Sequence, residues 1–161
     1  MTVTYDDIRT GLKCFWKVRA MDSLTVLCID DRPQVLDLRK EALASFDVSV
    51  EKVSSGYAAM KRLEGASVAA VLLEYKQEGM DAEAVAYQIK QRFPTLPIIL
   101  VSAYTDMPGR ILWLVDEYVM KSELPEGLVR ALERVTHTIN TDEMRKQQLL
   151  ANEARSRKPA A

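Results

Sequence analysis

The sequence predicts a doubly wound α/β fold, in which helices cover both faces of one parallel sheet. Short apolar runs alternate five times with helical patterns between about residues 24 and 139. Each connection between successive runs is long enough for a parallel crossover. The runs at 68–73 and 98–101 are apolar without alternation, as expected of strands that are buried on both faces. Such units wind right-handed and give three layers.

The first half of this pattern predicts two strands and two helices. Residues 24–29 are rich in β-favouring side chains and form the first predicted strand. Pro33 suits the first turn of the helix that follows. Alternation over residues 48–53 predicts the second strand, and the Ser54-Ser55-Gly56 segment is expected to cap the next helix.

The second half predicts three strands and two helices, at residues 68–73, 84–93, 98–101, 117–120 and 124–139 in chain order. Residues 103–114 contain Pro108 and Gly109, so a helix there is expected to be short or irregular. The apolar run Ile111-Leu-Trp-Leu114 either covers the core or forms a contact surface, and the core is favoured because an apolar run before a strand usually packs inside.

Length predicts one domain with two extensions. We assign residues 1–22 to an N-terminal extension, 23–139 to the domain, and 140–161 to a polar, partly helical tail. Whether residues 5–19 form a docking helix or an unstructured leader stays open.

Charge and composition exclude several classes of protein. The formal net charge is −1, which gives no overall field to attract nucleic acid or an anionic membrane. No uninterrupted apolar run reaches the ~18 residues of a membrane span, and charged residues interrupt the N-terminus where a signal peptide would be apolar. Cys14 and Cys28 form no metal-ligand or CxxC pattern. We therefore expect a reduced, cytoplasmic protein.

Polar residues follow four of the predicted strands: Asp30, Asp31, Glu74, Ser102 and Lys121. Ligands of open parallel sheets bind beyond the carboxyl ends of the strands, so these side chains are expected to meet. Three converging carboxylates repel one another unless a cation joins them, and oxygen ligands suit Mg²⁺. A lysine and a serine opposite suit phosphoryl oxygens. The pattern indicates phosphoryl binding, or phosphoryl transfer onto a carboxylate.

These residues lie in four segments that together resemble the receiver domains of bacterial two-component response regulators: Val26–Pro33, Val71–Glu74, Phe93–Ala103 and Asp116–Lys121. The resemblance covers about residues 24–139. It implies a flavodoxin-like (βα)5 domain with a five-stranded parallel sheet in the order 2-1-3-4-5.

The resemblance also implies a role for each residue at the strand ends. Asp30 and Asp31 correspond to the acidic pair that holds Mg²⁺, together with the backbone carbonyl of Lys76. Glu74 falls on the aspartate that accepts phosphate from a histidine kinase. Ser102 matches the switch hydroxyl, Lys121 the lysine that contacts the phosphoryl group, and Tyr118 the aromatic residue whose position reports activation.

Glutamate at position 74 is the main departure from the family pattern. Its carboxylate lies about 1.5 Å further out than that of aspartate, the length of one C–C bond. Glu74 either imitates a weakly phosphorylated state, with Lys121 and Ser102 engaged, or holds an inert site closed. Normal phosphotransfer is not expected, because in-line attack depends on exact placement. Mg²⁺ binding is expected to be weak or absent. The Lys76 ammonium either covers the acidic pocket or is an ordinary solvated loop lysine.

The resulting hypothesis is a single-domain, phosphorylation-independent receiver that acts through a kinase or a downstream protein and is not an enzyme. A homodimer stays open. One alternative is a receiver that binds Mg²⁺ and still transfers a phosphoryl group. Another is a phosphohydrolase of the haloacid dehalogenase type, which needs Asp-x-Asp where this chain has adjacent Asp30 and Asp31. No glycine-rich loop for a nucleotide follows the first strand.

Overall fold

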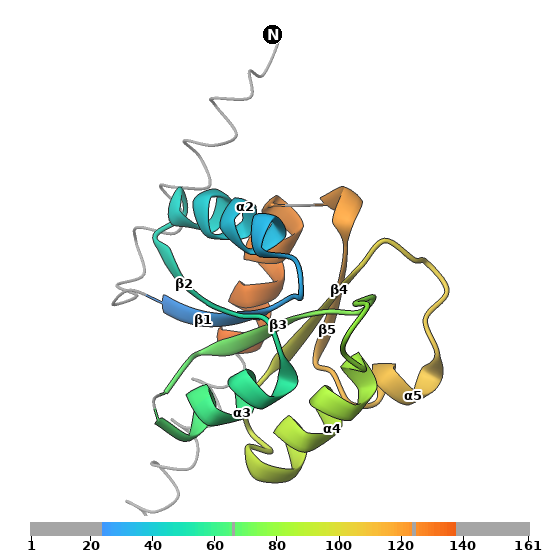
Figure 1. The fold of residues 1–161 in the computed structure, drawn as a ribbon. Coiled ribbons are helices and arrows are strands. Elements are labelled where there is room, and N and C mark those ends of the chain that lie inside the picture. The colour runs from blue at the N-terminus through green and yellow to red at the C-terminus, as the bar shows by residue number, and fades with distance from the viewer. Residues whose placement is uncertain (1–23, 66, 124, 138–161) are drawn as a thin grey trace, which may run out of the picture.

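Five parallel strands in the order β2-β1-β3-β4-β5 form the centre of the fold, as predicted (Figure 1). The computed structural model describes residues 24–65, 67–123 and 125–137. In chain order the elements are β1 (Leu24–Ile29), α2 (Pro33–Ala44), β2 (Val48–Val53), α3 (Gly56–Gly65), β3 (Ala70–Glu74), α4 (Ala82–Arg92), β4 (Ile98–Ser102), α5 (Gly109–Leu112), β5 (Glu117–Met120) and the 3₁₀ turn η1 (Lys121–Glu123). Residues 126–137 form a last helix.

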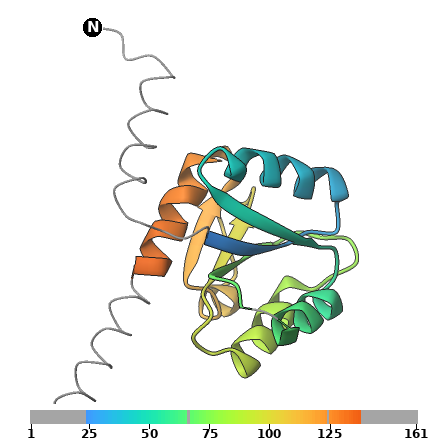
Figure 2. The same ribbon diagram turned by 90° about the vertical axis from the view of Figure 1, so that its left-hand side faces the viewer.

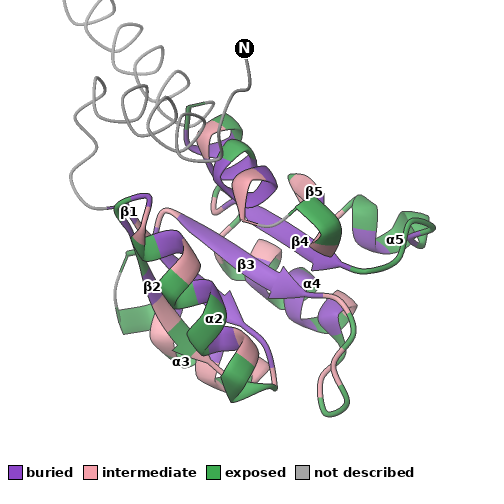
Figure 3. Cartoon of the chain, turned by 90° about the horizontal axis from the view of Figure 1, so that it is seen from above, coloured by how far each residue is buried: buried purple, intermediate pink, exposed green. Residues whose placement is uncertain are grey.

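The strands are buried according to their place in the sheet. Every residue of the central strands β3 and β4 is buried, which explains their uninterrupted apolar sequences (Figure 3). The edge strand β2 instead alternates between buried and more exposed residues over Val48–Glu51. Sequence pattern and sheet position therefore agree.

Helices cover both faces of the sheet, which gives three layers (Figures 1 and 2). One apolar core joins the sheet to α2 and to the helix of residues 126–137, through side chains such as Leu36, Leu43, Leu128 and Leu132. The second core joins the opposite face to α3, α4 and α5. The strand ends therefore lie at one edge of a firmly packed sheet.

Local sequence determines where the helices begin. Pro33 occupies the first turn of α2. The Ser55 hydroxyl accepts a hydrogen bond from the Ala58 backbone N–H at 3.1 Å, so the predicted cap of α3 is present. Asp81 caps α4 by accepting from the backbone N–H groups of Glu83 and Ala84.

The segment before β5 differs in part from the prediction. Helix α5 has four residues, as short as expected. Ile111 is fully buried, but Trp113 is 90% exposed and Leu112 is 42% exposed. The expectation that this whole run covers the core is therefore wrong for Trp113, because a single helical turn directs only one of its residues inward.

The proposed domain boundaries stay a prediction. The two extensions, the 5–19 segment and the end of the 124–139 helix lie outside the described residues. Within the part that the structure describes, no helix has the length and apolar character that crossing a membrane requires.

Candidate functional site

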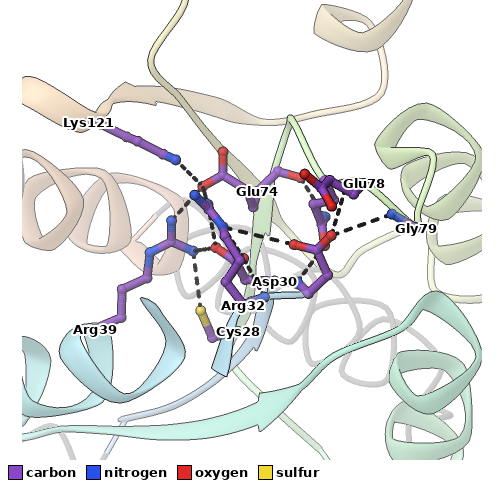
Figure 4. Close-up of polar contacts among 10 residues, drawn as sticks. Cys28, Asp30, Arg32, Arg39, Glu74, Glu78, Gly79 and Lys121 are labelled. Carbon is purple, nitrogen blue, oxygen red and sulfur yellow. Dashed lines mark hydrogen bonds and ion pairs between the residues drawn. The ribbon is translucent and has the colours of Figure 1, made fainter. Parts of the chain in front are cut away.

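Among the residues predicted at the strand ends, Asp30, Glu74 and Lys121 converge beyond the carboxyl edge of the sheet (Figure 4). Asp30 follows β1 directly, Glu74 ends β3, Ser102 ends β4 and Lys121 follows β5. The first three are buried, with exposed fractions of 0%, 1% and 0%. The parallel sheet therefore brings these polar groups together in a place from which water is largely excluded.

One carboxylate oxygen of Glu74 contacts three cationic side chains. Its Oε2 lies 2.7 Å from Nη2 of Arg39, 3.0 Å from Nζ of Lys121 and 3.5 Å from Nη2 of Arg32. The lysine was predicted from the sequence, whereas neither arginine was. Glu74 is therefore the centre of an ion-pair cluster, and its charge is compensated from three sides.

Asp30 is paired just as completely. The Arg32 side chain donates from Nε to Oδ1 and from Nη2 to Oδ2, both at 3.1 Å. The Arg32 backbone N–H also donates to Oδ1 at 3.0 Å. Arg39 Nη1 lies 3.6 Å from Oδ2. Because the hydrogen bond to Asp30 outweighs desolvation, the pKa of Arg32 is raised above its ordinary value.

Arg39 is, with Arg32, one of the site residues that were not predicted from the sequence. It is 5% exposed and lies on the inward face of α2, between the buried residues Leu36 and Leu43. A charged residue at the helical spacing of an apolar face was the signal that could have identified it. Burial by itself lowers the pKa of Arg39, but its contacts with Cys28 and Glu74 raise it overall. Arg39 is therefore a permanent buried cation.

Cys28 contacts this cation from β1. Its Sγ lies 3.5 Å from Nη1 of Arg39. Burial raises the pKa of the Cys28 thiol, and this effect exceeds the opposing influence of Arg39. Cys28 is thus a small core residue that also lies beside the cluster.

Asp31 lies at the rim of the cluster, with Oδ1 3.9 Å from Nε of Arg32, and it also holds the loop after β3. Its Oδ2 accepts hydrogen bonds from the backbone N–H groups of Glu78 at 2.6 Å and Gly79 at 3.4 Å. Its own backbone N–H donates to the side-chain oxygen of Gln77, whose amide nitrogen donates to the Glu74 carbonyl at 2.7 Å. The two loops are therefore tied together by hydrogen bonds.

Tyr104 joins the remaining predicted residues. Its backbone N–H donates to the Ser102 hydroxyl oxygen at 3.0 Å, and its carbonyl accepts from the Tyr118 hydroxyl. Lys76 Nζ donates to the Tyr104 hydroxyl at 2.7 Å and lies 5.3 Å from the ring centroid. The hypothesis that the Lys76 ammonium covers the acidic pocket is therefore wrong, because Tyr104 holds this side chain in an exposed position.

Comparison with known proteins agrees with this architecture. The family described as the response regulator receiver domain matches residues 26–133. The chain belongs to this family. Two curated relatives are the transcriptional regulator NtrC of Escherichia coli K12, 28% identical over 86 residues, and the sensor protein GacS of Pseudomonas syringae, 32% identical over 84. These matches cover 53% and 49% of this chain, but only 18% and 9% of the relatives' lengths.

Solved structures show the same fold. The response regulator TrrA of Thermotoga maritima, in complex with Mg²⁺-BeF, matches with a TM-score of 0.64 and 26% identity, over 70% of this chain and 98% of that one. NtrX of Brucella abortus in complex with ATP matches with a TM-score of 0.69 and 18% identity, over 77% and 29%. These structures share the three-layer fold of this chain.

Receiver domains typically bind Mg²⁺, but the residues of this receiver are not arranged for it. Both oxygens of Asp30 are paired with Arg32, and Oδ2 of Asp31 is hydrogen-bonded to the backbone. The Lys76 backbone pairs with Asp81 in an isolated bridge. Among the described residues, no three His, Cys, Asp or Glu side chains are grouped so that they could hold a metal ion. The predicted set of Asp30, Asp31 and the Lys76 carbonyl therefore does not fit the ion in this arrangement.

Proposed function

We propose that this receiver domain signals through protein contacts in a state set by Glu74 and not by phosphorylation. The observation that supports this most directly is the 3.0 Å contact between Glu74 Oε2 and Lys121 Nζ, made by a carboxylate that is 1% exposed. By resemblance to the family, Glu74 stands at the phosphoacceptor position and Lys121 at the position that contacts the phosphoryl group. In this structure the Glu74 carboxylate and the Lys121 ammonium form an ion pair with each other, without a phosphoryl group between them.

This pairing opposes phosphotransfer in two ways. A carboxylate must be accessible and aligned to attack a phosphodonor, and Glu74 is buried and held by Arg39 and Lys121. A phosphoryl group would also have to compete with Glu74 for the lysine. We therefore assign the chain no catalytic role and regard its site as a fixed structural centre.

The partner that we propose is another signalling protein of the cytoplasm, either a kinase or a downstream target. One of the structural relatives supports this, because TrrA has been solved in complex with the histidine kinase ThkA. Ser102 and Tyr118 both bond to Tyr104, so the loop after β4 has one defined arrangement to present to such a partner.

Intact mass after incubation with Mg²⁺ and a small phosphodonor tests this proposal. We expect the native chain to gain no phosphoryl group, while TrrA in the same mixture serves as the positive control. A gain that disappears in Glu74→Gln would contradict the proposal and would favour the alternative, a receiver that still accepts phosphate on Glu74.

A further inference from the structure

Arg32 and Arg39 lie among the carboxylates that correspond to the Mg²⁺ ligands and the phosphoacceptor of the family. We propose that the guanidinium groups of Arg32 and Arg39 together take the place of one divalent cation, so that this receiver binds no Mg²⁺ at its strand ends. This goes beyond the proposed function, because a receiver with an unphosphorylated Glu74 could still hold a metal.

The charges at the strand ends support the substitution. Asp30, Asp31 and Glu74 bring three negative charges, and Lys121 brings one positive charge. The net charge of these four groups is therefore −2, which one Mg²⁺ ion would neutralise. Arg32 and Arg39 supply two positive charges, so the cluster is neutral without an ion.

The arginines also bridge the carboxylates as a metal ion would. Arg32 contacts all three, at 3.1 Å from Asp30, 3.9 Å from Asp31 and 3.5 Å from Glu74. Arg39 joins Asp30 to Glu74, at 3.6 and 2.7 Å. A guanidinium group stays protonated throughout the physiological pH range and presents a rigid fork of donors, so it can hold two carboxylates in a fixed geometry.

Burial makes the arrangement hard for an ion to displace. Arg39 is 5% exposed and Asp30 is fully buried, so Mg²⁺ would add two charges to a neutral cluster whose centre is desolvated and whose Arg32 lies at the exposed rim. The ion could reach the carboxylates only if at least one arginine left them, and a displaced Arg39 would lose its carboxylate partners while its side chain stays buried beneath α2. Leaving a buried charge unpaired is strongly unfavourable.

The test is isothermal titration with MgCl₂ at constant ionic strength, together with thermal unfolding at each Mg²⁺ concentration. Three proteins are compared: the native chain, Arg32→Met/Arg39→Met, and Arg62→Met/Arg92→Met. The last is the matched control, because it loses two arginines that are paired with Glu51 and Glu64 away from the site. Both double variants carry the same net charge.

We expect saturable Mg²⁺ binding by Arg32→Met/Arg39→Met alone, with a rise in its Tm of about 3 °C or more at tenfold excess over Kd. Adding Asp31→Asn to that variant should abolish the binding. Saturable binding by the native chain would overturn the proposal, even if Glu74 accepts no phosphate. Absence of binding in the folded double variant would overturn it too, since something other than the arginines would then exclude the ion.

If the double variant does not fold, the same titration is made on Arg32→Met alone. This variant is expected to fold, because the Arg32 side chain is 46% exposed and its loss creates no large cavity. It should bind Mg²⁺ measurably where the native chain does not. A folded Arg32→Met chain that binds no Mg²⁺ would count against the proposal.

Discussion

The guanidinium of Arg39 is the contact that joins helix α2 to both buried carboxylates. Replacing it with Met leaves Glu74 and Asp30 buried with less compensation. Breaking a buried ion pair on one side typically costs about 3–5 kcal/mol, and we expect Arg39→Met to cost about 3 because Arg32 and Lys121 remain. Urea unfolding monitored by circular dichroism measures this loss.

Two further variants give this prediction its control. Arg92→Met removes an exposed arginine that pairs with Glu64 and should change the free energy of unfolding by no more than about 0.5 kcal/mol. Adding Glu74→Gln to Arg39→Met should recover part of the loss, because the uncompensated charge is removed. Purely additive effects of the two substitutions would contradict direct coupling between Arg39 and Glu74.

The Cys28 thiol predicts a pH dependence of stability. Burial raises its pKa above the ordinary value of 9.0, so the folded chain keeps this proton more tightly than the unfolded chain does. Its contribution is fully present below about pH 9 and is lost as the pH rises through the pKa of the folded state. In a Cys14→Ser background, the free energy of unfolding should fall by up to about 1 kcal/mol per pH unit above pH 9.

The corresponding Cys28→Ala chain is the reference for this measurement, because it shares every other titrating group. The difference between the two chains should shrink as the pH rises from 8 to 10. A difference that grows over this range would show that the thiolate is the form that the fold stabilises.

At the residue scale, the sequence predicted the carboxylates and the lysine of the site, but neither of its arginines. Asp30, Asp31, Ser102 and Lys121 could be predicted because they follow strands directly, and a parallel sheet brings such positions together. Arg39 comes from a helix face, where its meaning depends on which residues of α2 point inward. The direction of the Lys76 side chain depends on Tyr104, which is 28 residues away along the chain.

At the element scale, Gly56 lies where α3 approaches α4. A Cβ atom at Gly56 would lie 2.7 Å from a methyl carbon of Val85, whereas nothing lies within 4 Å of a Cβ at Gly65. We expect Gly56→Ala to cost about 1–2 kcal/mol through overpacking. Gly65→Ala should be neutral or stabilise by about 0.5 kcal/mol, since no glycine among the described residues has a positive φ.

Thermal unfolding of these two glycine variants, with Gly56→Ala/Val85→Ala as the rescue, checks the contact between the helices. The rescue should recover part of the stability lost in Gly56→Ala relative to Val85→Ala alone. Equal effects of Gly56→Ala and Gly65→Ala would mean that the two helices do not meet closely at Val85.

The boundaries of helices and strands were predicted to within a few residues where the spacing of apolar residues is regular. The first strand was predicted as residues 24–29 and is observed as Leu24–Ile29. The third was predicted from residue 68, but β3 begins at Ala70, because only there does the segment align with Val26 of β1. The exposure of Trp113 could not be predicted, since apolar content does not show which side of one helical turn faces the core.

At the scale of the whole molecule, the alternation of strands and helices was enough to predict the fold class. The order 2-1-3-4-5 came from the family resemblance, and the structure confirms it. The charge balance of the site could not be predicted in the same way, because it joins the loop after β1, helix α2 and the residue after β5. Such a cluster can be identified only from the folded structure, because its residues are far apart in the sequence.

In the function proposed for this receiver, ion pairs made by the chain itself fix its state. The measurement that tests this is two-dimensional ¹H–¹⁵N NMR of the native chain before and after adding Mg²⁺ with beryllofluoride, because TrrA has been solved in complex with Mg²⁺-BeF. We expect the backbone signals of Ser102, Tyr104, Tyr118 and Lys121 to stay in place. Saturable shifts at these residues would show that the site still accepts the metal and a phosphoryl-like group. They would contradict the proposal that ion pairs within the chain fix its state.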